Sequence, residues 1–129
     1  MKQIIGAVAL VVPDYDDAIA FYVEKVGFDL IEDTRLSEDK RWVLIAPKGS
    51  SETRLLLAKA DGAAQVAAIG NQTGGRVCLF LNTDDFDRDF QAMTKSGVAF
   101  LEEPRTEVYG KVAVFQDPFG NKWDLIQHF

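Results

Sequence analysis

The chain has 129 residues, of which 47% are hydrophobic and 26% charged, and its formal net charge is −6. This length suits one domain with a sizeable core. The acidic balance disfavours nucleic acids and anionic membranes as partners, because both are bound through basic patches. The apolar run after Lys2 is shorter than the ~20 residues of a membrane helix and lacks a small-residue cleavage site, so we interpret it as a buried strand. The single cysteine, Cys78, permits no intramolecular disulfide, which favours a reducing cytoplasm.

The first half of the chain reads as a strand, a helix and three further strands. Residues 4–12 are rich in β-formers, and Pro13 ends them. Asp14 or Asp16 can cap a helix that ends at Gly27. Helical spacing predicts one apolar face on this helix, made of Ile19, Tyr22, Val23 and Val26. The further strands are expected at residues 28–35, 41–46 and 53–58.

The second half repeats this order. A strand at residues 76–82 precedes a helix capped by Asp84 or Asp85 and ended by Gly97. The apolar stripe of this helix is predicted to be Phe86, Phe90 and Met93. Strands are then expected at residues 98–102, 111–116 and 122–128.

The two halves correspond at a nearly constant offset, which indicates an internal duplication. A shift of 69 places residues 8–10 on residues 77–79, and a shift of 70 places Gly27 on Gly97. Residues 61–75 are small, polar and glycine-rich, so they read as a linker with a short helix at residues 63–69. The chain is therefore expected to be one domain of two βαβββ modules, residues 1–60 and 76–129.

Three stretches carry a family resemblance that extends over essentially the entire chain: VALVVPDYDDAIAFYVEKVGF, GGRVCLFLNTDDFDRDF and YGKVAVFQDPFGNKWDLIQ. They resemble the vicinal oxygen chelate superfamily, which includes glyoxalase I, fosfomycin- and bleomycin-resistance proteins and extradiol dioxygenases. The resemblance implies an α+β fold in which paired βαβββ modules form an open, U-shaped mixed sheet around a cavity. It also implies a homodimer.

The family's usual chemistry uses a divalent metal held by the first and last strands of each module. The resemblance puts those four ligand positions at Ala7, Leu55 (Leu56 if the register slips by one), Arg76 and Asp124. Alanine and leucine cannot ligate through their side chains, and arginine is a permanent cation with donors only.

The histidine count agrees, because the chain's one histidine, His128, cannot supply a two-histidine iron site or a histidine and cysteine zinc site. We therefore predict no metal and no other cofactor. A carboxylate-only calcium or magnesium site stays open, although no D-x-D-x-D-G loop is present.

The resemblance places Arg76 and Asp124 at one cavity, with Arg76 as the positive charge in the metal's place. Arg76 would either pair with Asp124 or receive an anionic group of a ligand; the alternative is a purely structural ion pair. Further ligand-binding candidates are Trp42, Trp123, Tyr109 and Arg105. Both tryptophans have flat faces for stacking, with packing in the core or in an interface as the alternative. The alternative for Arg105 is an ordinary solvated residue at the end of a strand.

The function expected from these residues is metal-free binding of a small organic molecule in a sheet-lined cavity by a cytoplasmic homodimer. One alternative is a glyoxalase-like enzyme of lyase, isomerase or dioxygenase type, with Asp124, Glu107 or Tyr109 as acid or base. Another is sequestration of a cationic drug, which the net charge of −6 suits.

Overall fold

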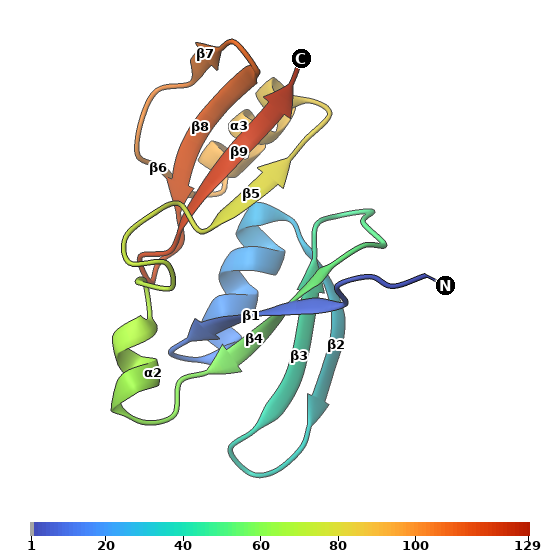
Figure 1. The fold of residues 1–129 in the computed structure, drawn as a ribbon, viewed down its shortest axis with the longest axis vertical. Coiled ribbons are helices and arrows are strands. Elements are labelled where there is room, and N and C mark those ends of the chain that lie inside the picture. The colour runs from blue at the N-terminus through green and yellow to red at the C-terminus, as the bar shows by residue number, and fades with distance from the viewer. Residues whose placement is uncertain (1) are drawn as a thin grey trace. The chain divides into compact units, whose positions relative to one another are not determined.

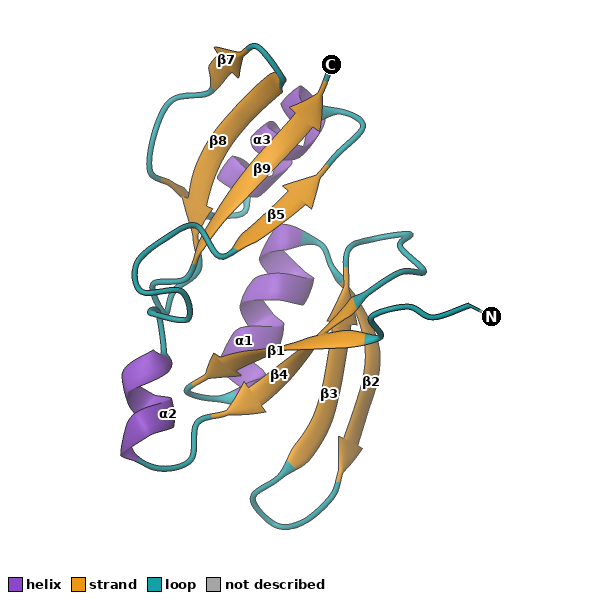
Figure 2. Ribbon diagram, in the orientation of Figure 1, coloured by secondary structure: helices purple, strands orange, loops and turns teal. Residues whose placement is uncertain are grey.

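The computed structural model describes residues 2–129, which form two compact units (Figure 1). One unit ends at Ile69 and the other spans Gly70–Phe129. Each contains a mixed β-sheet and a helix on it, so the predicted α+β fold is confirmed, with one mixed sheet in each unit (Figure 2). Within residues 2–129, no helix has the length and apolar character needed to cross a membrane.

The first unit has a four-stranded sheet in the order β1-β4-β3-β2, with β1 and β4 parallel. Its elements in chain order are β1 (Ala7–Val12), α1 (Tyr15–Ile19), η1 (Ala20–Val26), β2 (Asp29–Arg35), β3 (Arg41–Ala46), β4 (Arg54–Lys59) and α2 (Ala63–Ala68). Asp14 caps α1 by accepting a hydrogen bond at 2.9 Å from the backbone N–H of Asp17. Gly27 ends η1 with a φ of 98°, as the glycine signal predicts.

The buried face of the first helix differs from the predicted stripe. Its fully buried residues are Tyr15, Ala18, Phe21 and Tyr22. Of the predicted stripe only Tyr22 is fully buried, and Ile19, Val23 and Val26 lie at its half-buried edge. The segment η1 is π-helical, and its i→i+5 hydrogen bonds change the residue spacing on which the prediction relied.

The second unit has a sheet in the order β5-β9-β8-β6, with β7 also paired to β8. Its elements are β5 (Leu79–Asn82), α3 (Phe86–Lys95), β6 (Ala99–Phe100), β7 (Arg105–Glu107), β8 (Gly110–Gln116) and β9 (Lys122–His128). Asp85 caps α3 by accepting a hydrogen bond at 3.1 Å from the backbone N–H of Arg88. Strands β5 and β6 are shorter than the predicted strands at residues 76–82 and 98–102, and β7 was not predicted.

Helix α3 covers one face of the second sheet and so creates the core of this unit (Figure 2). Aromatic rings continue from the helix across the sheet with centroids 4.5–5.7 Å apart, in the order Phe86, Phe90, Phe100, Phe115 and Trp123. Side chains alternate along a strand, so the intervening residues point to the opposite side. We call that side the helix-free face; Phe80, Val114, Asp124 and Ile126 lie on it.

Candidate ligand-binding site

Asp124 lies in the middle of the helix-free face. Its neighbours in β9, Trp123 and Leu125, are buried on the side of α3. The cross-strand register places Phe80 of β5 on one side of Asp124 and Val114 of β8 on the other. Phe80 has 64% of its surface exposed, although phenylalanine is usually buried. A carboxylate thus lies beside an accessible aromatic ring on an otherwise aliphatic floor.

One oxygen of the Asp124 carboxylate lacks a hydrogen-bond partner among the described residues. Its Oδ1 atom is buried and accepts no hydrogen bond from any described residue. Burial raises the pKa of Asp124 above its usual value, while the charge of Arg105 lowers it and that of Glu102 raises it. A buried acceptor without a donor is energetically unfavourable, so a ligand N–H or O–H at this point would recover a lost interaction.

Arg105 and two acids border the site. The guanidinium of Arg105 donates to Glu102 at 3.1 Å and to Glu107 at 2.7 Å. Glu102 also accepts a hydrogen bond from the backbone N–H of Val114, which fixes it beside the strand. With Asp124, the group contains three acids and one base, so its charge balance favours a neutral or cationic ligand over an anionic one.

Tyr109 and Glu107 lie at the far end of this group. Tyr109 is in the turn between β7 and β8, is 47% exposed, and has its ring centroid 6.4 Å from that of His128. Glu107 already accepts the guanidinium of Arg105, so its carboxylate is engaged in an ion pair. Both residues stay predictions as acid or base, and Glu107 would have to leave Arg105 to act as one.

The two tryptophans differ in their environment. Trp123 is only 3% exposed and stacks on Phe115, with centroids 5.7 Å apart, on the face opposite Asp124. It is therefore a core residue, the packing alternative of the sequence analysis. Trp42 lies on β3 of the first unit, 39% exposed, and its neighbour Val43 is buried under the helix. Trp42 keeps an accessible ring on the helix-free side of its own sheet.

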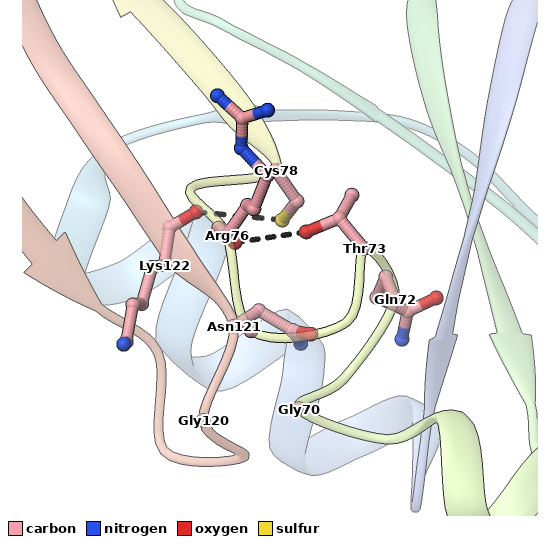
Figure 3. Close-up of a pocket in the computed structure, with 9 residues that line it drawn as sticks. Gly70, Gln72, Thr73, Arg76, Cys78, Gly120, Asn121 and Lys122 are labelled. Carbon is pink, nitrogen blue, oxygen red and sulfur yellow. Dashed lines mark hydrogen bonds between the residues drawn. The ribbon is translucent and has the colours of Figure 1, made fainter.

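Arg76 does not pair with Asp124. Among residues 2–129, no ion pair joins the two, and Arg76 is exposed in the loop before β5. It lines a small pocket together with Lys122 and Asn121 (Figure 3). The ion pair considered as the ligand-free state is therefore not formed.

The register of the two sheets changes the correspondence between the modules. Leu55 and Trp123 both face the helices, so Leu56 is the counterpart of Asp124. Ala7 is in register with Arg54, and the backbone N–H of Cys78 donates to the carbonyl of Lys122, the residue before Trp123. Cys78, and not Arg76, therefore corresponds to Ala7.

These positions do not fit the metal implied by the family. Neither leucine can ligate through its side chain, and burial raises the pKa of the Cys78 thiol, which keeps it protonated. Arg54, in register with Ala7, adds a cation where a ligand would be needed. In the part of the chain that the structure describes, no cluster of three or more His, Cys, Asp or Glu residues could hold an ion.

The fold and this site define a class of protein. The sequence model of the Glyoxalase/Bleomycin resistance protein/Dioxygenase superfamily matches residues 4–125. The chain belongs to this superfamily, and the resemblance noted in the sequence is confirmed.

Individual relatives extend over nearly the whole chain. An uncharacterized protein of Shewanella frigidimarina (strain NCIMB 400) is 58% identical to this chain. The aligned region covers 98% of this chain and 95% of the relative. The crystal structure of TnmS3, an antibiotic binding protein from Streptomyces sp. CB03234, is 33% identical, with a TM-score of 0.78 and coverage of 100% and 98% of the two chains. UcmS2 is 28% identical, with a TM-score of 0.84 and 98% coverage of both chains.

Phe80 and Glu102 are the residues of this site that sequence reasoning missed. The stretch VCLFL does carry a signal, because strand alternation puts Phe80 opposite Leu79 and Leu81. Glu102 has no such signal, because it contacts the site through a backbone hydrogen bond that only the folded sheet creates.

Proposed function

We propose that this chain is a cytoplasmic, metal-independent protein that binds a small organic molecule. The bound molecule would lie on the helix-free face of the second sheet. The observation that carries the proposal is the buried, unpartnered Oδ1 of Asp124 beside the exposed ring of Phe80. A ligand would stack on the ring and donate a hydrogen bond to the carboxylate. This combination of apolar surface with one fixed polar group is typical of small-molecule sites.

One of the similar structures supports binding over catalysis. TnmS3, at 33% identity, is described as an antibiotic binding protein, and the resemblance in sequence extends over its whole length. Of the four positions that correspond to the family's metal ligands, only Asp124 offers a carboxylate, and the others contain alanine, leucine and arginine or cysteine, so we derive no metal-based reaction for this chain.

A cationic ligand is the second candidate, favoured by the surplus of acids around the site. Asp124, Glu102 and Glu107 face one arginine there. A protonated amine that reached Asp124 would form a charge-assisted hydrogen bond, which is stronger than a neutral one.

A thermal-shift screen of EDTA-treated protein tests the proposal. The library should contain aromatic amines, aromatic alcohols and polycyclic antibiotics, because a ligand of the native state raises the unfolding temperature by mass action. We expect hits whose affinity Phe80→Ala weakens. Val108→Ala serves as the matched control, because Val108 is 99% exposed in the same unit and lies in the turn after β7.

Two outcomes would count against the proposal. One is equal loss of affinity in the Phe80 and Val108 variants, which would place the ligand elsewhere. The other is turnover of the hemithioacetal of methylglyoxal and glutathione after addition of nickel or zinc, which would support the enzyme alternative.

The assembly that we propose is a homodimer. The support is the number of large apolar side chains with more than a third of their surface exposed on or beside strands, which include Ile4, Ile5, Val8, Leu30 and Ile31. Light scattering on the purified chain measures the subunit number directly, and a monomer at all concentrations would contradict the proposal.

A further inference from the structure

The small pocket that Arg76 lines lies where the chain enters the second sheet, and the proposed function does not use it. Its lining comes from the loop before β5 and the turn before β9: Gly70, Gln72, Thr73, Gly75, Arg76, Cys78, Gly120, Asn121 and Lys122 (Figure 3). Its volume is about 70 Å³. A water molecule takes about 30 Å³ of liquid, so the pocket has room for a group of a few heavy atoms.

The charge of this lining is opposite to that of the chain. Two bases, Arg76 and Lys122, line the pocket without an acid, whereas the whole chain has 20 acids and 14 bases. Neither base belongs to an ion pair in the described part of the chain. Figure 3 shows the guanidinium of Arg76 and the ammonium of Lys122 extending away from the ring of loop residues in different directions. Their long stems would let both charges reach a group at the mouth of the pocket.

The loop itself adds uncharged donors. Gly74 and Gly75 have φ values of 71° and 100°, which glycine adopts without strain and which leave the backbone unshielded. The backbone N–H groups of Gly75 and Arg76 donate to no acceptor among residues 2–129. Free backbone donors beside cations are the recurring features of anion sites in proteins.

The remaining polar groups do not oppose an anion strongly. The thiol of Cys78 donates to the carbonyl of Lys122 at 3.4 Å, and burial raises its pKa, so it adds no negative charge. Asp117 is the nearby acid, and its carboxylate accepts hydrogen bonds from the backbone of Phe119 and from both nitrogens of Asn121. The Oδ1 of Asn121 is buried without a partner among the described residues and could accept a hydrogen bond from the O–H of a hydrogen phosphate.

We propose that this pocket binds a small oxyanion, a phosphate or carboxylate group, between Arg76, Lys122 and the backbone of the glycine loop. Guanidinium and ammonium groups bind such oxygens through charge-assisted hydrogen bonds. The pocket does not depend on the proposed function, because an anion can fill it while the helix-free face is empty. Lys122 does lie on the same face as Asp124, two residues along β9, so their Cα atoms are about 7 Å apart.

Titration of the ¹⁵N-labelled full chain with inorganic phosphate, and separately with acetate, tests the proposal at constant ionic strength. For at least one of the two anions, we expect saturable shifts of the amide signals of Gly75, Arg76, Asn121 and Lys122, with a Kd on the order of 1 mM. Arg76→Gln and Lys122→Gln should each weaken binding about tenfold. Lys95→Gln is the matched control, because Lys95 is an exposed, unpaired base of the same unit.

Shifts that grow linearly for both anions would overturn the proposal, since they indicate screening only. So would equal affinity in wild type and in both pocket variants. The spectra of the variants also show that each is folded, so a loss of binding cannot be mistaken for unfolding.

Phenyl phosphate distinguishes the two sources of the oxyanion. Binding tighter than that of inorganic phosphate, with the gain lost in Phe80→Ala, would assign the oxyanion to a larger ligand that also lies on the helix-free face. Equal binding of the two phosphates would assign the pocket to the free anion. Both results support the anion pocket, and a failed thermal-shift screen would leave it intact.

Discussion

A single carboxylate, Asp124, combines an unfavourable burial with a position suited to binding. Burial raises its pKa above the usual 3.8, so the folded state holds the proton more tightly than the unfolded state does. Its contribution to stability is therefore present below the unfolded pKa and is lost as the pH rises through the folded pKa. A group retained at such a cost is a reasonable mark of function.

The stability of Asp124→Asn should reflect this titration. Near pH 4 the free energy of unfolding of the variant should be close to that of wild type, and toward pH 7 the variant should become the more stable protein, because it buries no charge. Urea unfolding at several pH values measures the difference. Glu103→Gln, at an exposed acid of the same unit, is the matched control for the change of charge. A difference between Asp124→Asn and wild type that does not change with pH would contradict the account.

The two tryptophans should respond differently to truncation. Trp123→Ala removes a ring that is 3% exposed and stacked on Phe115, so it should cost about 3–5 kcal/mol of unfolding free energy. Trp42→Ala, at a side chain 39% exposed, should cost about 1 kcal/mol or less. Chemical denaturation measures both, and similar losses would show that the burial assigned to Trp123 is wrong.

The sequence predicts the chemistry of a residue where it depends on the type of side chain. It predicts less well the face of a sheet on which that side chain lies. That Ala7 and Leu55 cannot ligate a metal follows from the letters alone. The side on which Trp123 lies does not, because one step along a strand reverses the face. The predicted site therefore contained Asp124 and Arg105. It also contained Trp123, which lies on the opposite face, and it lacked Phe80.

At the scale of elements, local signals located most boundaries. Strands β3 and β9 begin and end where the apolar pattern predicts. Asp14 and Gly27 mark the start and the end of the first helix, α1 and η1, as predicted. Strand β7, Arg105–Glu107, lacks an apolar pattern and exists because β8 offers it hydrogen bonds. That kind of strand depends on its partner and has no signal of its own.

The repeat offset was the other failure at this scale. The sequence indicated 69 or 70 residues throughout, whereas the register relates Ala7 to Cys78, an offset of 71, and Leu56 to Asp124, an offset of 68. The segments between corresponding strands differ in length, so the offset drifts along the chain. A drift of one residue is enough to exchange the two faces of a sheet.

The cap of α3 provides a test at the element scale. Asp85→Ala should cost about 1 kcal/mol, because its carboxylate accepts a hydrogen bond from the backbone N–H of Arg88. Asp84→Ala is the matched control and should cost less than about 0.5 kcal/mol, because Asp84 forms only an exposed ion pair with that arginine. Equal effects in thermal unfolding would show that the cap has been assigned to the wrong residue.

At the scale of the molecule, the family relation and the site chemistry point in different directions. The chain belongs to a superfamily whose name includes two enzyme classes, yet the positions that correspond to its metal ligands offer one carboxylate and one neutral thiol. A fold does not determine a function, so the side chains decide. They favour a binding protein whose ligand takes the place of a metal beside Asp124.

The most direct test of this claim is a native mass spectrum of the chain with a ligand found by the thermal-shift screen. The spectrum is recorded once after EDTA treatment and once after addition of nickel or zinc, and it reports ligand, metal and subunit number together. We predict the same ligand-bound species in both samples, with a dimeric mass and no divalent ion in stoichiometric amount. A ligand adduct that appears only with the metal would contradict the central claim.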